Sequence, residues 1–133
     1  MANPNIVNVT SIYGNTAYVT PSTTSATTSW TYNGSTSLTG LTPSAGTVNR
    51  VTSLVVSNVT SSAANATVQI ANNATFGSGT AYSIAYQISV PANSSVIITD
   101  KTTSFYVTEN QSVGVTSGTA SALVYTATFE AIS

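Results

Sequence analysis

The ten residues Ala81–Val90, AYSIAYQISV, decide the fold prediction. Large apolar side chains occupy every second position, and alanine, serine or glutamine occupies the positions between them. Since successive side chains of a strand point to opposite faces, this alternation predicts a half-buried antiparallel strand, with one face in a core and the other in solvent. The predicted inward face consists of Tyr82, Ile84, Tyr86, Ile88 and Val90.

The same alternation recurs at residues 66–71 and 122–132, and in the second segment Leu123, Tyr125 and Phe129 share one face. Residues 51–58 are more uniformly apolar, as is typical of a central strand covered on both faces. Shorter strands are expected at residues 6–10, 12–13, 17–20, 96–99, 104–107 and 111–116, with turn residues between them. Because helix formers are scarce and no fixed-period repeat is found, the sequence predicts an all-β, antiparallel β-sandwich of the jelly-roll or Ig-like type.

Residues 21–47 differ in composition from the rest of the chain. They are rich in Ser, Thr, Gly and Pro and contain few large apolar residues, among them Trp30 and Tyr32. Long segments without periodic structure in small domains are usually functional or flexible. We therefore expect residues 1–47 to form N-terminal strands and an extended N-terminal arm that leans on a neighbouring molecule. Residues 48–133 are expected to form the sandwich core.

Charged residues are scarce: the 133-residue chain has two basic and three acidic residues, and no His or Cys. The lack of His and Cys excludes zinc, haem and iron–sulfur sites built on those ligands, Ser-His-Asp triads and thiol nucleophiles. Two cations are too few to neutralise the phosphates of a nucleic acid or to hold an anionic membrane surface. We expect no cofactor, no metal, no nucleic-acid partner and no membrane partner.

Polar character comes instead from Thr, Ser and Asn, which together make up 58 residues. A surface with so little charge repels nothing, which favours a protein that packs against copies of itself or against a large partner. The expected edge strands also have almost no Lys or Pro to discourage pairing, which predicts that partner subunits cover them.

The few charged residues are weak catalytic candidates. Glu109 and Glu130 could form the carboxylate pair of a glycosidase, and Lys101 could activate a serine. Each has a simpler structural interpretation, because Glu109 and Lys101 fall at expected turns and Glu130 falls on the polar face of a strand. We therefore predict that the protein is not an enzyme.

Four residues are candidate interface residues: Trp30, Tyr32, Arg50 and Glu130. Arg50 is the only arginine, and it is expected to pair with a carboxylate such as Glu130 or with the C-terminus of a neighbouring chain. Trp30 and Tyr32 share one face if this segment is extended. They could form a buried aromatic pair, an intersubunit anchor or a platform for stacking sugars.

Several motifs, taken in their order along the chain, resemble those of one family. They are LVVSN at residues 54–58, ATVQI at 66–70, ISVPANSS at 88–95, FYVTENQSV at 105–113 and TFEAIS at 128–133. This order resembles that of small β-sandwich structural proteins in the virions of tailed bacteriophages, of the marine cyanophage type, and the opening MANPNIVNVT is similar as well. The family's acidic turn reads Glu-Gly-Asp-Ser, whereas residues 109–112 read ENQS, so any contact that the family's Asp makes is lost here.

The resemblance implies a non-enzymatic virion structural protein that is made in the host cytoplasm and placed on the capsid surface. A capsid decoration or cement protein is the leading hypothesis, with the major capsid protein or other virion subunits as partners. Analogy with such proteins favours a homo-oligomer, specifically a trimer. The alternatives are a neck, tail or fibre component of the virion and a surface carbohydrate-binding module.

Overall fold

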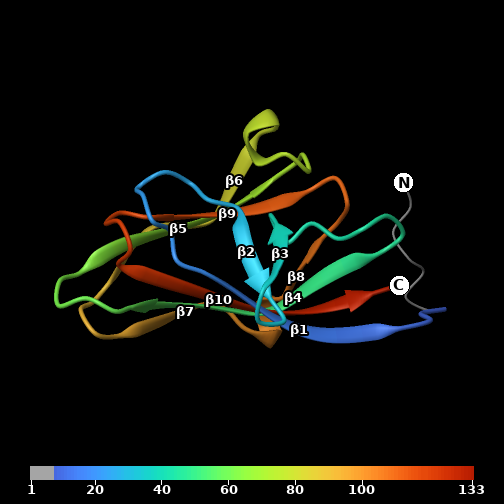
Figure 1. Cartoon of the computed structure of the whole chain (residues 1–133), viewed down its shortest axis with the longest axis horizontal. Helices are drawn as coiled ribbons and strands as arrows, with labels where there is room; N and C mark the ends of the chain where they lie inside the picture. Colours follow the sequence, from blue (N-terminus) through green and yellow to red (C-terminus); the bar gives the residue numbers. More distant parts are fainter. Residues whose placement is uncertain (1–7) are drawn as a thin grey trace.

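The computed structural model describes residues 8–133 and places them in two layers of antiparallel β-sheet (Figure 1). Over this range the helical segments are two short 3-10 helices, η1 (Phe76–Ser78) and η2 (Lys101–Thr103). In chain order the strands are β1 (Ile12–Val19), β2 (Ser29–Tyr32), β3 (Thr36–Thr39), β4 (Val48–Asn58), β5 (Ala64–Ala71), β6 (Ala81–Val90), β7 (Ser95–Thr99), β8 (Phe105–Val107), β9 (Ser112–Ser117) and β10 (Leu123–Ile132). The predicted all-β, antiparallel sandwich is confirmed.

The larger sheet is organised around β10, which pairs with β1 on one side and with β4 on the other. Its strand order is β3-β2-β1-β10-β4-β7, and β8 pairs with the N-terminal part of β4. The ladder between β4 and β10 contains a β-bulge at Thr52, whose hydroxyl donates to the carbonyl of Thr128 at 3.2 Å. With this bulge the two strands stay paired from Val48 opposite Ile132 to Asn58 opposite Leu123.

The smaller sheet has the strand order β6-β5-β9. The outer edge of β9 is closed by the N-terminal part of the chain. Thr27 and Val115 exchange backbone hydrogen bonds of 2.9 and 3.0 Å, and the amide of Val113 donates to the carbonyl of Gly40 at 2.7 Å. Both β6 and β9 are edge strands of this sheet, and within residues 8–133 the outer edge of β9 is the one that makes such bonds to another segment.

The core lies between the two sheets and is filled by β-branched and aromatic side chains. Its largest buried side chains are Trp30 of β2 and Tyr125 and Phe129 of β10. Two side-chain hydrogen bonds join the larger sheet to β9. The Tyr125 hydroxyl donates to the Thr116 carbonyl at 2.6 Å, and the Trp30 indole N–H donates to the Val113 carbonyl at 3.1 Å. These bonds offset the cost of burying the polar atoms of both rings.

Residues 8–47 belong to the same sandwich, so the predicted boundary between residues 47 and 48 is wrong. β1 pairs with β10 along its whole length, and both Trp30 and Leu41 are fully buried in the common core. A segment with few apolar residues can still be anchored when those few reach the core. Residues 1–7 of the predicted arm lie outside the described residues. A strand was expected at residues 6–10, and the described part of it, residues 8–10, is irregular.

β6 has the predicted bounds, but the side chains assigned to its inward face are mostly exposed. The ladder with β5 contains two irregularities. At the first, Tyr86 and Gln87 both lie opposite the single residue Thr67. At the second, Val68 pairs with Ala85 and Gln69 pairs with Ser83, so Ile84 is an extra residue without a partner on β5. Each extra residue reverses the alternation of side chains, so positions two apart do not stay on one face. The exposed fractions are 57% for Tyr82, 38% for Ile84, 63% for Tyr86 and 37% for Ile88, whereas Ala85 and Val90 are buried.

Candidate functional site

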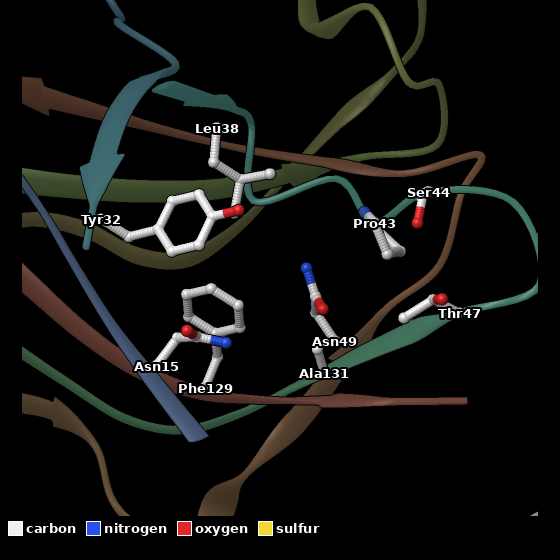
Figure 2. A pocket seen from close by; sticks show the side chains of 9 residues that line it. All are labelled: Asn15, Tyr32, Leu38, Pro43, Ser44, Thr47, Asn49, Phe129 and Ala131. Carbon is white, nitrogen blue, oxygen red and sulfur yellow. The ribbon is translucent and has the colours of Figure 1, made fainter. Parts of the chain in front are cut away.

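A shallow pocket of about 120 Å³ opens between the β2–β3 hairpin, the inner face of the larger sheet and the loop before β4 (Figure 2). Figure 2 shows the rings of Tyr32 and Phe129 at one side of the pocket and Pro43 and Asn49 at the other. The lining residues are Asn15, Tyr32, Leu38, Pro43, Ser44, Thr47, Asn49, Phe129 and Ala131.

Local contacts fix the side chains of the pocket. The rings of Tyr32 and Phe129 meet edge to face, with centroids 6.0 Å apart and an interplanar angle of 63°, an arrangement that aromatic pairs favour. The side-chain amide of Asn49 is buried and donates to the Leu41 carbonyl at 2.8 Å. This bond ties the loop between β3 and β4 to the floor of the pocket.

The pocket is chemically neutral. Its lining supplies aromatic rings, amides and hydroxyls but no acidic or basic side chain. Ligand pockets usually measure about 300–1,000 Å³, whereas a cavity of about 150 Å³ admits a benzene ring. At about 120 Å³ the pocket is smaller than either, so it can accept only a small neutral group such as part of a ring, and its lining has no acidic or basic side chain to transfer a proton.

Trp30 and Tyr32 do not form a joint surface. Trp30 is fully buried and hydrogen-bonded to Val113, so the prediction that it anchors a neighbouring molecule or stacks a sugar is wrong. No part of its ring reaches the surface, because β2 turns this side chain between the sheets. Tyr32 is half-buried and lines the pocket, and its role as an interface residue stays a prediction.

The structure brings Arg50 and Glu130 together, as expected. They lie directly opposite each other on β4 and β10, with 3.9 Å between Arg50 Nη1 and Glu130 Oε2. Each side chain is 36% exposed, so solvent screens the pair and its contribution to stability is at most about 1 kcal/mol. Arg50 also donates to the Ser104 hydroxyl at 3.3 and 3.4 Å. An intermolecular role for Arg50 or Glu130 stays a prediction.

The other acidic residues lie in turns and have separate partners. Glu109 Oε2 accepts from the Gly46 amide at 3.3 Å. Asp100 caps η2 by accepting from the hydroxyl and the amide of Thr102 at 2.6 and 2.9 Å, and these hydrogen bonds lower the pKa of its carboxyl.

Over residues 8–133, no group of three or more His, Cys, Asp or Glu side chains is placed to hold a metal ion. In the same range no helix is long and apolar enough to cross a membrane.

The exposure of four large apolar side chains on β6 is the feature that the sequence alone did not predict. We define the β6 strip as the four exposed side chains of Tyr82, Ile84, Tyr86 and Ile88. The signal for it was present in the alternation of this segment, but the alternation was assigned to the core. Large apolar side chains are also exposed elsewhere, but β6 gathers four of them on one strand.

Comparison with protein-family models, with curated proteins and with solved structures finds no match for this chain. The functional interpretation therefore depends on the residues and on the geometry of the pocket and the β6 strip.

Proposed function

We propose that the chain is a non-enzymatic structural subunit of a bacteriophage virion, with capsid decoration as its role. A position in the neck, tail or fibre is the alternative within the same class. The observation that supports this proposal best is the β6 strip, because four large apolar side chains left in solvent along one strand favour burial against other subunits. The virion as the setting rests on the resemblance of the strand and turn motifs.

The distribution of charge supports the same proposal. No charged residue occurs between Arg50 and Asp100, so β5, β6 and β7 are neutral throughout. When a neutral surface closes against another subunit, no ion has to leave water, and the desolvation cost of charged interfaces is avoided. Such contacts are also insensitive to salt, because screening acts on charges.

Quantitative gel densitometry of purified virions tests the role. Hundreds of copies per particle are expected for shell decoration, whereas about a dozen copies indicate a symmetric ring at the neck or tail. Virions that lack the chain altogether would refute the proposal. In a second measurement the virions are held in about 1 M salt, where the Debye length falls to about 3 Å. Retention of the chain is expected, and its release at high salt alone would contradict neutral contacts.

The pocket beside Tyr32 supports a second candidate function, the binding of a small saccharide group. The observation in its favour is the combination of an aromatic ring, amides and hydroxyls without charge. A glycan array tests it with Tyr32→Ala, and with Tyr13→Ala as the control because Tyr13 is an exposed tyrosine outside the pocket. Loss of a glycan signal in Tyr32→Ala alone would favour this function, and a wild-type chain without any signal would remove it.

A further inference from the structure

The pocket beside Tyr32 contains one buried acceptor that the fold leaves unused. Asn49 is 2% exposed, and its Nδ2 donates to the Leu41 carbonyl at 2.8 Å. Within residues 8–133 its Oδ1 accepts no hydrogen bond. Because the two ends of a side-chain amide diverge, the bond to Leu41 turns Oδ1 towards the pocket that Asn49 lines (Figure 2). Buried side-chain polar atoms are normally hydrogen-bonded, so this oxygen is placed to accept a donor from a ligand.

The aromatic wall of the pocket lies next to this acceptor. Asn49 on β4 pairs with Ala131 on β10, and Phe129 lies two residues before Ala131 along β10. Such diagonal neighbours in a ladder are about 7–8 Å apart, so one small group can touch both side chains. The Tyr32 ring meets Phe129 edge to face and extends the apolar wall. A ligand in the pocket therefore meets an acceptor and aromatic rings at the same time.

The lining also restricts the charge of the ligand. No acidic or basic side chain lines the pocket, so a carboxylate, phosphate or ammonium group would leave water without a partner of opposite charge. The bound group must therefore be neutral. It must also donate to Asn49 Oδ1 and present an apolar part to the rings.

The volume of the pocket narrows the choice further. A cavity of about 150 Å³ holds benzene, which is roughly 25 Å³ for each ring carbon. At about 120 Å³ the pocket has room for roughly five atoms of that size. An acetamido group stays within this limit, and it combines a neutral N–H donor with an apolar methyl. A hydroxyl group alone supplies the donor without the apolar part.

Hydroxyl groups in the lining favour a sugar as the carrier of the acetamido group. Ser44 is exposed and Thr47 is half-buried, and their hydroxyls make no hydrogen bond to residues 8–133. A sugar ring presents hydroxyls around its edge, and these can pair with both side chains. A peptide that carries the same acetamido group offers them fewer partners.

We propose that this pocket binds the acetamido group of an N-acetylated sugar, with the N–H donating to Asn49 Oδ1 and the methyl packed against the rings of Tyr32 and Phe129. This inference rests on the second candidate function, the binding of a small saccharide group, and names the chemical group that is recognised.

A heteronuclear NMR titration of the unaltered chain tests the inference with three matched ligands. They are the methyl glycoside of N-acetylglucosamine, its analogue with an acetyl ester in place of the acetamido group, and methyl glucoside. We expect the first to bind with a Kd of about 1 mM and to shift the side-chain amide signals of Asn49. The ester keeps the methyl but lacks the N–H, so its Kd is expected to be about tenfold higher, and methyl glucoside is expected to show no saturable binding. Equal binding of the acetamido and ester ligands would overturn the inference.

Asn49→Leu tests the acceptor itself, because leucine has a similar volume and no polar side-chain atom. The variant is expected to bind the acetamido and ester ligands equally weakly. Asn65→Leu is the matched control, since Asn65 is exposed on β5 outside the pocket, and it is expected to keep the preference for the acetamido ligand. Far-UV circular dichroism checks folding, and if Asn49→Leu does not fold, the titration of the unaltered chain decides. A preference that survives in folded Asn49→Leu would overturn the role of Asn49.

The inference and the proposed functions fail separately. If glycosides bind but the acetamido ligand has no advantage, the inference fails and saccharide binding stands. If no glycan and no glycoside binds, both fail, and the copy number in virions alone decides the virion role. If N-acetylalanine amide binds as tightly as the acetamido glycoside, the assignment to a sugar is overturned in favour of a peptide.

Discussion

Replacing Trp30 with alanine tests the conclusion that the N-terminal third is part of the sandwich. Trp30 lies on β2, it has no exposed surface, and its indole N–H donates to the Val113 carbonyl of β9 at 3.1 Å. The side chain therefore joins the larger sheet to the smaller one. If residues 21–47 were an arm outside the core, removing this ring would change the free energy of unfolding very little.

The expected magnitude follows from the burial and the hydrogen bond. Truncation of a buried Trp to Ala costs about 3–5 kcal/mol, since the apolar transfer energy is lost and a cavity remains. The Val113 carbonyl also loses its donor, which adds about 1 kcal/mol. We expect Trp30→Ala to lower the free energy of unfolding by about 5 kcal/mol, a large part of the 5–15 kcal/mol typical of a domain. Trp30→Phe, which keeps a ring but removes the donor, is expected to cost about 1–2 kcal/mol.

Urea unfolding followed by far-UV circular dichroism is the suitable assay, because Trp30 is the only tryptophan and its replacement removes the fluorescence signal. Tyr13→Ala is the control: Tyr13 is 68% exposed, and its loss is expected to change the free energy of unfolding by less than about 0.5 kcal/mol. If Trp30→Ala costs less than about 1 kcal/mol, Trp30 does not join the sheets and the reasoning is refuted.

Three further predictions concern alkaline stability, one glycine and the ion pair. Burial raises the pKa of Tyr125 to about 12 from 10.0, so its contribution to stability is complete below pH 10 and is lost as the pH rises towards 12. Urea unfolding at several pH values should show the free energy falling by about 1.4 kcal/mol per pH unit in that window, and Tyr125→Phe should remove this fall. Gly40→Ala is expected to destabilise by about 2 kcal/mol, because Gly40 has φ +66° and a Cβ would lie 2.6 Å from the Ser112 Cβ; an unchanged Tm would contradict this. Arg50→Ala should cost less than about 1 kcal/mol in the same unfolding assay, since its pair with Glu130 is long and part-exposed, and a larger loss would show that the pair is stronger than its geometry indicates.

Most of the strand pattern could be predicted from the sequence, because side-chain alternation in a strand follows directly from backbone geometry. Residues 123–132 contain no extra residue in either ladder, because the bulge between β4 and β10 lies on β4 at Thr52, and the predicted inward face of Leu123, Tyr125 and Phe129 is buried. In β6 the alternation predicted the correct bounds of the strand, but it assigned to the core side chains that the structure leaves exposed. Bulges depend on how a neighbouring strand pairs, which no single segment of sequence contains.

The candidate site was less predictable for a related reason. Trp30 and Tyr32 stand two positions apart, and the sequence alone allowed a buried pair or a joint surface. The structure buries the first completely against β9 and leaves the second at the pocket, because what covers each position is set by segments distant in the sequence. Pairing of Arg50 with Glu130 was easier to predict, since the chain has one guanidinium and three side-chain carboxylates.

The position of β10 has a consequence for how the protein is made. β10 follows the other nine described strands along the chain, yet it lies between β1 and β4, which do not pair with each other. Ile12 pairs with Ile132, and contacts so distant along the chain close slowly, as in other β-sandwiches that fold in milliseconds to seconds. During translation, β1 and β4 therefore remain without their shared neighbour until residues 123–132 have left the ribosome. The larger sheet can be completed only then.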